Sequence, residues 1–376
     1  MVWEQVAKLR SMTVFEERIE ALKKEGKKVQ IDAFLVTSEK NMRYFAGFST
    51  LAIERFAGIV IPVRMGLPVV IVPRLEETKA KKSPLRKIIS YSDSESPALL
   101  LKKVVKELKL EKATLGIEGT LPFKFYQMVV ATSSKIRTKD ASNLFSQLRC
   151  VKSEQELGMI EKAADIVAEG IKAGIEFTKP GETELAISNQ IERTIKESGG
   201  ESVPFCLVLS GPNSALPHGE TSNRKVSEKD VVLMDVGAVY EGYYGDLTRT
   251  IFVREATRKQ REIYQVVAQA QEAAIRRVKP NIRAEEVDAA ARRVIEKAGY
   301  GEFFTHRTGH GLGLEVHEEP YIVQGNKTTL RPGMAFTIEP GIYFFEKFGV
   351  RIEDNIAVSQ TKAKMLSHIS KELLVV

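Results

Sequence analysis

The chain has 376 residues, of which 43% are hydrophobic and 28% are charged, and its formal net charge is +7. This length predicts two domains rather than one core, and the composition is typical of a soluble globular protein. The longest apolar runs, such as FAGIVIPV at 56–63, are far too short to cross a bilayer, so we expect no membrane partner.

The excess of basic residues does not by itself predict a nucleic-acid partner. Lysines are dispersed among glutamates along helix-like stretches, and short clusters such as KAKK at 79–82 have no accompanying aromatic motif. We interpret the charge as a solvated surface with many ion pairs, and expect no nucleic acid. Cys150 and Cys206 lie in different regions and do not make a disulfide framework, which favours a cytoplasmic location.

Residues 1–28 alternate charged and apolar residues, which predicts an amphipathic helix rather than a signal sequence. Residues 30–145 then read as alternating helices and strands. This half has no histidine and no cluster of carboxylates, so we expect a scaffold or gating domain. Its strand-like and helix-like segments are QIDAFLVT, GIVIPV, VVIVP, SPALLLKKVVKELKL and TLGIEG.

The domain boundary is predicted near LFSQLRCVKSEQE. Ser153 and Glu156 there form an S-x-x-E capping box, which indicates the start of a long helix. The sequence therefore predicts an α/β (α+β) fold with a smaller N-terminal α/β domain, residues 1–148, and a second domain, residues 149–376.

The second domain contains an internal duplication. KPGETELAISNQIERTIKESG at 179–199 aligns without a gap with KPNIRAEEVDAAARRVIEKAG at 279–299, an offset of 100 residues. Each copy follows a helical run, at 153–173 or 257–278, ends in glycine and leads into strand-like sequence. We infer two related halves with pseudo-twofold symmetry.

A pair of aspartates follows the first copy, in VVLMDVGAVYEGYYGDLTRTIFV. A Glu-Gly turn at 241–242 predicts a hairpin that pairs Tyr240 with Tyr243. In that register Asp235 and Asp246 are diagonal neighbours on one face, inside otherwise apolar strands. Two buried carboxylates side by side are costly unless a cation neutralises them.

A pair of glutamates follows the second copy, in GMAFTIEPGIYFFEKFGVRIEDNIAV. With a turn centred near Lys347, Glu339 and Glu353 are also predicted to be diagonal neighbours on one face. His310 lies between the two acidic pairs in the sequence. Four carboxylates and one neutral imidazole carry a formal charge of about −4, which two divalent cations would cancel.

Oxygen ligands with one histidine suit Mn²⁺, Co²⁺, Fe²⁺ or Zn²⁺. Two such ions held close together can activate a shared water and polarise a carbonyl, which is the chemistry of hydrolysis. Other motif interpretations fail on spacing. HEEPY at 317–321 is not H-E-x-x-H, and GHGLGLE lacks the strand and helix order of a dinucleotide-binding fold.

Several segments resemble the signatures of the pita-bread metallopeptidases, specifically the Xaa-Pro dipeptidases (prolidases) and aminopeptidase P. The segments are LPHGE, GDLTRT, RTGHGLGLEVHEEP, PGMAFTIEPGIY, GVRIED and the closing LSHISKELLVV. NMRYFAGFST resembles the creatinase/prolidase N-terminal domain, and RCVKSEQELGMIEKAADI resembles the usual entry into the catalytic domain. The resemblance covers nearly the whole chain and implies a creatinase-like domain followed by a pita-bread catalytic domain.

The resemblance also implies a ligand set for two metal ions. Asp235 would bind one ion, Asp246 and Glu353 would bridge both ions, and His310 and Glu339 would complete the ligand shell of the second ion. Glu339 is in addition the family's candidate for moving a proton from the bridging water to the leaving nitrogen.

Further roles are implied for residues around the ligands. His218 and His317 would hold the scissile carbonyl and stabilise the tetrahedral intermediate, and His306, Arg351 and Tyr343 would orient the substrate. Glycines at 309, 311 and 313 would let the backbone pass close to ligand and metal. The remaining histidine, at 368, is predicted to be a structural residue of the last strand.

The resemblance therefore implies hydrolysis of the bond preceding proline in Xaa-Pro dipeptides, with Mn²⁺ or Co²⁺ before Zn²⁺ or Fe²⁺. Aminopeptidase P activity on longer peptides, a C–N hydrolase for a small amide, and a non-catalytic binding protein are the alternatives. A methionine aminopeptidase would share the ligands but normally lacks such an N-terminal domain. We expect a homodimer in which GFSTLAIERFAG at 47–58 closes the far side of the partner's cleft.

Overall fold

The computed structural model describes residues 12–50 and 54–376. The chain divides into two compact units, Met1–Arg149 and Cys150–Val376. The helix predicted for residues 1–28 is present as α2 from Val14 to Lys28, with a Thr13–Glu16 capping box. Its first 11 residues, like residues 51–53 of the predicted closing loop, lie outside the described part of the chain.

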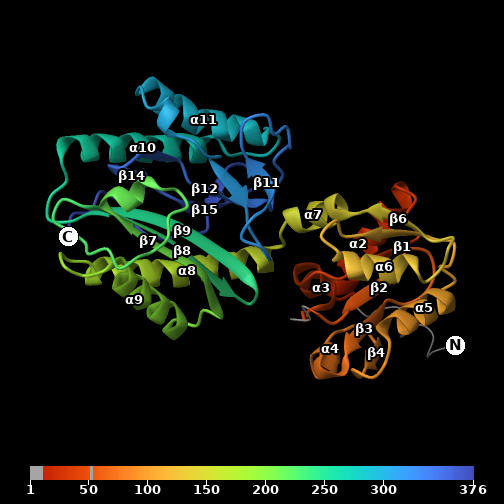
Figure 1. The fold of residues 1–376 in the computed structure, drawn as a ribbon. Coiled ribbons are helices and arrows are strands. Elements are labelled where there is room, and N and C mark those ends of the chain that lie inside the picture. Colours follow the sequence, from red (N-terminus) through yellow and green to blue (C-terminus); the bar gives the residue numbers. More distant parts are fainter. Residues whose placement is uncertain (1–11, 51–53) are drawn as a thin grey trace, which may run out of the picture. The chain divides into compact units, whose positions relative to one another are not determined.

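Within residues 12–50 and 54–149, the first unit is built on a six-stranded mixed sheet in the order β4-β3-β2-β1-β5-β6 (Figure 1). Four residues of β1 and five each of β2 and β3 are buried, as continuous apolar runs predict for central strands. The strands are β1 (Ala33–Val36), β2 (Gly58–Pro62), β3 (Val69–Pro73), β4 (Lys87–Tyr91), β5 (Thr114–Ile117) and β6 (Arg137–Asp140). The helices are α2, α3 (Glu39–Ala46), α4 (Glu77–Ala80), α5 (Pro97–Glu107), α6 (Phe123–Val130) and, running into the next unit, α7 (Ser142–Cys150).

The second unit starts its long helix α8 (Glu154–Phe177) at Ser153, whose capping box with Glu156 is confirmed. Helix α9 (Glu184–Glu197) and the antiparallel sheet β7-β8-β9 follow. The strands of this first half are β7 (Ser202–Ser210), β8 (Val231–Tyr240) and β9 (Tyr243–Phe252). Ile171 of α8 and Ile191 of α9 join Met234 of β8 in one core cluster, so the two helices cover one face of this sheet.

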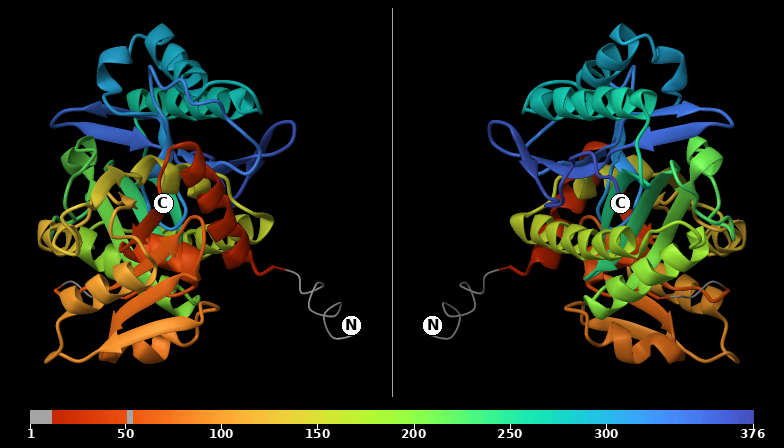
Figure 2. Two further views of the ribbon diagram at one scale, coloured as in Figure 1. Left: turned by 90° about the vertical axis from the view of Figure 1, so that its right-hand side faces the viewer. Right: turned by 90° about the vertical axis from the view of Figure 1, so that its left-hand side faces the viewer.

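The second half repeats this plan. Helices α10 (Arg258–Arg277) and α11 (Ala284–Lys297) lead into a five-stranded sheet, in the order β11-β10-β12-β15-β16, and a two-stranded ladder, β13-β14. Figure 1 shows α8 and α9 on one side of the strands and α10 and α11 on the other, and the end-on views in Figure 2 show the same layers. The strands are β10 (Gly309–Gly311), β11 (Glu318–Ile322), β12 (Ala335–Ile338), β13 (Gly341–Phe344), β14 (Phe348–Arg351), β15 (Asp354–Val358) and β16 (Ala363–Met365).

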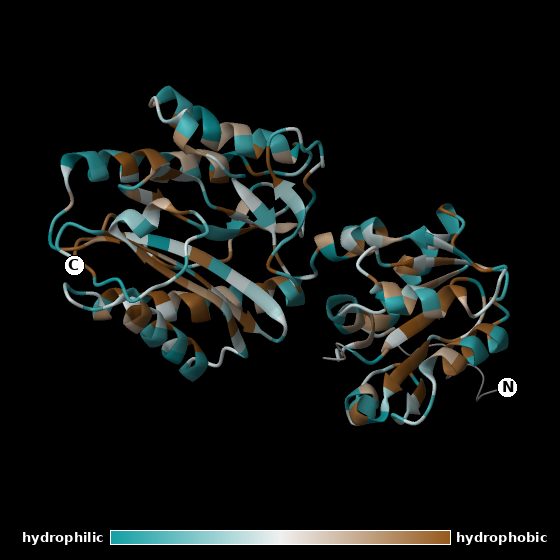
Figure 3. Ribbon diagram, in the orientation of Figure 1, coloured by the Kyte–Doolittle hydropathy of each residue, from teal (hydrophilic) through white to brown (hydrophobic). Residues whose placement is uncertain are grey.

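The backbone confirms the duplication. Helices α9 and α11 begin at 184 and 284, and both end before a glycine of left-handed conformation, Gly199 (φ 94°) and Gly299 (φ 84°). The turns before them also use left-handed residues at matching positions, Gly181 and Asn281. Figure 3 shows hydrophobic residues along the central strands of the first unit, whereas strands of the second unit alternate hydrophobic and hydrophilic residues.

Two predictions on the second half need correction. The ladders pair Ile338 with Asp354 and Gly341 with Arg351, so Glu339 falls opposite Glu353 rather than diagonal to it. The ladder breaks there because Pro340 has no N–H to donate. The prediction that His368 belongs to a strand is wrong, because His368 lies beyond β16, is exposed, and its Nε2 lies 3.0 Å from Glu161 Oε1.

No helix within 12–50 and 54–376 is long and apolar enough to span a membrane.

Candidate metal centre

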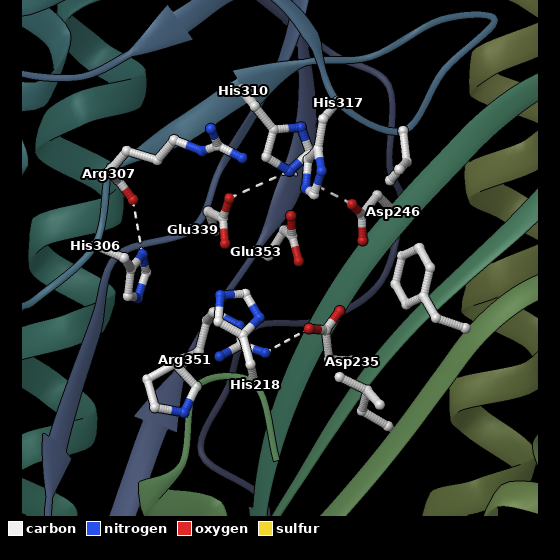
Figure 4. A pocket seen from close by; sticks show the side chains of 14 residues that line it. His218, Asp235, Asp246, His306, Arg307, His310, His317, Glu339, Arg351 and Glu353 are labelled. Carbon is white, nitrogen blue, oxygen red and sulfur yellow. Dashed lines mark hydrogen bonds and ion pairs between the residues drawn. The ribbon is translucent and has the colours of Figure 1, made fainter. Parts of the chain in front are cut away.

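The predicted site residues converge on one pocket of about 580 Å³ in the second unit (Figure 4). All of them line it except Tyr343, which is buried behind His306 and Arg351. The lining residues are Phe205, Leu207, Pro217, His218, Asp235, Asp246, His306, Arg307, His310, Val316, His317, Glu339, Arg351 and Glu353.

The two aspartates come from the hairpin β8–β9 in the predicted register. Tyr240 pairs with Tyr243 and Gly237 with Asp246, so Asp235 lies two positions from the residue that faces Asp246. Asn355 of β15 fixes the backbone of Asp246 from the other half, because its side chain accepts from the Asp246 N–H at 3.1 Å and donates to its carbonyl at 2.6 Å. Asp246 is therefore held rigidly where the two halves meet.

The two glutamates come from the break between the second-half ladders. Glu353 is buried, and its Oε2 accepts from the Thr248 hydroxyl of β9 at 2.7 Å. Glu339 Oε1 accepts from the Thr337 hydroxyl at 3.3 Å. Because neither glutamate belongs to a ladder, both can turn inward beside the hairpin of the first half.

His310 presents one nitrogen to the carboxylates. Its Nδ1 lies 3.1 Å from the Gly311 carbonyl, which can only accept, so Nδ1 carries the proton and Nε2 has a free lone pair. Nε2 lies 3.3 Å from Glu339 Oε1 and 3.6 Å from Asp246 Oδ2. A Cβ at Gly309 would lie 1.9 Å from the Thr337 carbonyl oxygen, so only glycine lets this strand approach β12.

The donor atoms fit a divalent cation. Asp246, His310 and Glu353 each offer one ligand atom, and the three atoms lie within 4.8 Å of one another. Among the described residues, Asp246 Oδ1 and Glu353 Oε1 are buried without a hydrogen-bond partner. Lone pairs facing one another in a buried site are strongly unfavourable unless a cation or protons lie between them.

Electrostatics support the same interpretation. Burial, followed by the neighbouring carboxylates, raises the pKa of Asp246 and of Glu353 well above the ordinary range. Burial also raises the pKa of Glu339 to about 7. Without a cation the site therefore retains protons at neutral pH, and a bound cation would replace them.

Asp235 lies outside this cluster of three and begins a chain of hydrogen bonds. Its Oδ2 accepts from Arg351 Nη2 at 2.5 Å, and Arg351 Nη1 donates to the Tyr343 hydroxyl at 2.8 Å. His306 Nδ1 faces the Arg307 carbonyl at 2.7 Å, so its proton is on Nδ1 and Nε2 accepts from Tyr343 at 2.9 Å. Burial, then the Arg351 cation, lowers the pKa of His306 to about 3, so the ring is neutral.

The two outer histidines lie at the mouth of the pocket. The ring of His317 meets that of His310 edge-on, with centroids 4.2 Å apart, and burial lowers its pKa. His218 is exposed and lies on the loop after β7 (Figure 4). Both can present a ring N–H to a bound molecule.

The sequence interpretation assigned no role to five residues that line the pocket, namely Phe205, Leu207, Pro217, Arg307 and Val316. Arg307 is a cation in the HRTGH motif whose guanidinium stacks on Tyr321 at 4.6 Å. Phe205 and Leu207 alternate along β7, and Leu207 pairs with Asp235. That alternation beside an acid-bearing strand is the signal that could have identified them.

Comparisons with known proteins cover nearly the whole chain. Residues 158–360 match Metallopeptidase family M24, and residues 18–151 match the Creatinase/Prolidase N-terminal domain. The chain is 37% identical over 362 residues to an Xaa-Pro dipeptidase of Pyrococcus furiosus, covering 96% of this chain and 100% of that one. A recombinant prolidase from Thermococcus sibiricus aligns with a TM-score of 0.91 at 40% identity over 98% and 100% of the two chains. An X-Pro aminopeptidase from Thermotoga maritima aligns with a TM-score of 0.85 at 31% identity over 95% and 99%.

Proposed function

Since the chain belongs to Metallopeptidase family M24 and carries a creatinase/prolidase N-terminal domain, we propose that it hydrolyses the bond preceding proline in Xaa-Pro dipeptides. The observation that carries this proposal is the buried cluster of Asp246, His310 and Glu353, whose unpartnered carboxylate oxygens and imidazole lone pair suit a cation. The Xaa-Pro preference is inferred from the relatives that share the full length of the chain.

In this proposal two divalent cations occupy the pocket. Asp235 would hold the first ion, and His310 and Glu339 would hold the second. Asp246 and Glu353 would each hold both ions. When bound, such ions supply a water of lowered pKa and polarise the substrate carbonyl. Mn²⁺ and Co²⁺ are our first choices, with Zn²⁺ and Fe²⁺ next, because oxygen ligands and one imidazole suit all four.

The chain's own residues would bind the peptide and move its protons. Glu339, a carboxylate beside His310 in the pocket, would accept and return a proton at its carboxylate oxygen. His218 and His317 would donate ring N–H groups to the carbonyl oxygen as its negative charge develops. Neutral His306, fixed by Tyr343, would contact the substrate, and Arg351 would hold Asp235 and Tyr343 in place.

Aminopeptidase P activity is the second candidate, favoured by the structural similarity to the Thermotoga maritima X-Pro aminopeptidase. Both activities need the same pocket and differ in whether a longer substrate fits beyond the proline. We further propose that the protein works as a homodimer in the cytoplasm, with residues 47–58 of one protomer limiting the length of peptide that the partner accepts.

The test is a peptide panel assayed after metal-stripped protein is reloaded with Mn²⁺, Co²⁺ or Zn²⁺. We expect cleavage of Ala-Pro, little cleavage of Ala-Ala, and slower cleavage of Arg-Pro-Pro. Equal or faster cleavage of Arg-Pro-Pro would assign aminopeptidase P instead. Failure to bind metal, with no peptide cleaved, would leave a non-catalytic binding protein, and cleavage of small amides alone would indicate a different C–N hydrolase.

A further inference from the structure

Helix α11 carries a buried acid that does not line the pocket. Asp288 is 1% exposed, and its two oxygens accept from Arg292 Nε and Nη2, one turn later, both at 3.0 Å. Asp288 Oδ1 also accepts from the Thr308 hydroxyl at 2.7 Å. Burying a carboxylate is costly unless it is paired, and Arg292, whose side chain is 21% exposed, supplies a bidentate partner.

Arg292 makes further bonds to a single segment, residues 304–308. Nη1 donates to the Phe304 carbonyl at 3.1 Å and Nη2 to the His306 carbonyl at 3.0 Å. The guanidinium also lies over the Phe304 ring, 4.3 Å from its centroid. Because the Thr308 hydroxyl also donates to Asp288, the two side chains contact this segment at its start, middle and end.

The held segment belongs to no helix or strand, and backbone bonds to neighbouring strands fix it only at its end, where the Thr308 N–H donates to the Ile322 carbonyl at 2.9 Å. It nevertheless carries His306 and Arg307 into the pocket (Figure 4). Its last residue, Thr308, accepts at its carbonyl from the backbone N–H of Glu339 at 2.8 Å. A shift of this segment would therefore move a substrate-facing ring and the backbone of a proposed ligand together.

From these contacts we propose that Asp288 and Arg292, together the Asp288–Arg292 clamp, are positioning residues that hold His306 against the substrate. The inference rests on the proposed function. Asp288 acts by orienting the guanidinium, whose five N–H donors have a fixed geometry, so that two of its bonds reach the carbonyls. Neither residue lines the pocket, and both act through the segment that carries His306.

The first test is Asp288→Asn, which keeps the size of the side chain and removes the charge that orients Arg292. We expect kcat/KM for Ala-Pro to fall by about 10- to 100-fold, the range for partners that orient a site from outside it. Glu272→Gln is the matched control, because Glu272 forms the same i,i+4 pair with Arg276 on α10, exposed to solvent. It should leave kcat/KM within about twofold, as expected for an exposed ion pair.

A double-mutant cycle separates positioning from general damage. If the clamp acts mainly through His306, Asp288→Asn should cause a much smaller loss in a protein that already carries His306→Ala, and the remainder reflects the backbone of Glu339. An equal loss in both backgrounds would overturn the proposal. Should Asp288→Asn fail to fold, Arg292→Lys takes its place, because a lysine keeps the charge pair but cannot reach both carbonyls.

A spectroscopic test is independent of catalysis. With ¹⁵N-labelled histidine, the ring nitrogens of His306 should shift in Asp288→Asn or Arg292→Lys and stay unchanged in Glu272→Gln. Unchanged His306 signals in the clamp variants would refute the clamp even if activity fell. If the wild-type protein cleaves no Xaa-Pro peptide, the proposed function fails, while this shift still decides whether the clamp positions His306.

Discussion

Glu339→Gln should stabilise the metal-free protein at neutral pH. In the native fold burial raises the pKa of Glu339 from 4.5 to about 7. The native state therefore holds a proton that the unfolded chain releases, so the stability due to Glu339 is complete below pH 4.5 and is lost as the pH rises to 7. Glutamine resembles the protonated acid at every pH and removes this dependence.

The size of the effect follows from the shift in pKa. At about 1.4 kcal/mol per pKa unit, raising the pKa from 4.5 to about 7 corresponds to about 3 kcal/mol. Relative to the variant, the wild-type protein should lose this amount between pH 4.5 and pH 8. Asp246 and Glu353 add to the pH slope of both proteins. Because the charge of Glu339 also raises their pKa, the difference between the two curves reports Glu339 together with its repulsion of these two carboxylates.

The assay is urea unfolding of EDTA-treated protein, followed by circular dichroism from pH 4.5 to pH 8. Glu272→Gln, which removes an exposed carboxylate from α10, is the control and should run parallel to the wild type. Two results would refute the assignment of a proton to Glu339. One is a plot of unfolding free energy against pH for Glu339→Gln that runs parallel to that of the wild type, and the other is a Glu339→Gln protein that loses stability relative to the wild type as the pH rises. Excess Mn²⁺ should reverse the order, because the proposed ligand is then needed as a carboxylate.

Three further changes test other parts of the structure. Asp246→Asn should lower the bound metal, measured by plasma emission spectroscopy, and reduce kcat/KM by more than the roughly 100-fold of an outer-shell change; full metal content would contradict its proposed role. Gly309→Ala should destabilise the protein by about 3 kcal/mol in urea unfolding through its clash with Thr337, whereas Gly158→Ala on α8, with open space around it, should gain about 1 kcal/mol. Both cysteines are buried and burial raises their pKa to about 11 and about 12, so the native protein should not react with DTNB until it is unfolded.

The first hairpin could be predicted residue by residue because a two-residue turn fixes its register. Once Tyr240 faces Tyr243, every other pair follows, and the shared face of Asp235 and Asp246 is determined. The second hairpin could not be predicted in this way. Its two ladders break at Pro340, and the turn lies one residue earlier than Lys347, so Glu339 moved from a diagonal to an opposite position.

The clamp could not be predicted because its partners are set by tertiary structure. In the sequence, Asp288 and Arg292 have the same i,i+4 spacing as Glu272 and Arg276, which form an exposed ion pair. Only the packing of α11 on the segment before β10 decides which pair is buried and what it holds. His368 illustrates the opposite error, since an isolated histidine near an apolar tail was assigned to a strand that ends before it.

The duplication has a consequence for stability that neither half shows alone. Asp246 is supplied by the first half of the catalytic unit, and His310 and Glu353 by the second, so a cation bound by these three connects the halves. Without it, the same junction contains buried carboxyl groups whose raised pKa values favour bound protons over charge, and the bonds across it, such as Asn355 to the Asp246 backbone, lose the support of the ion. Metal binding should therefore stabilise both halves together, and its removal should speed hydrogen exchange in β9 and β15 alike. Faster exchange in only one of these strands would mean that the cation does not connect the halves.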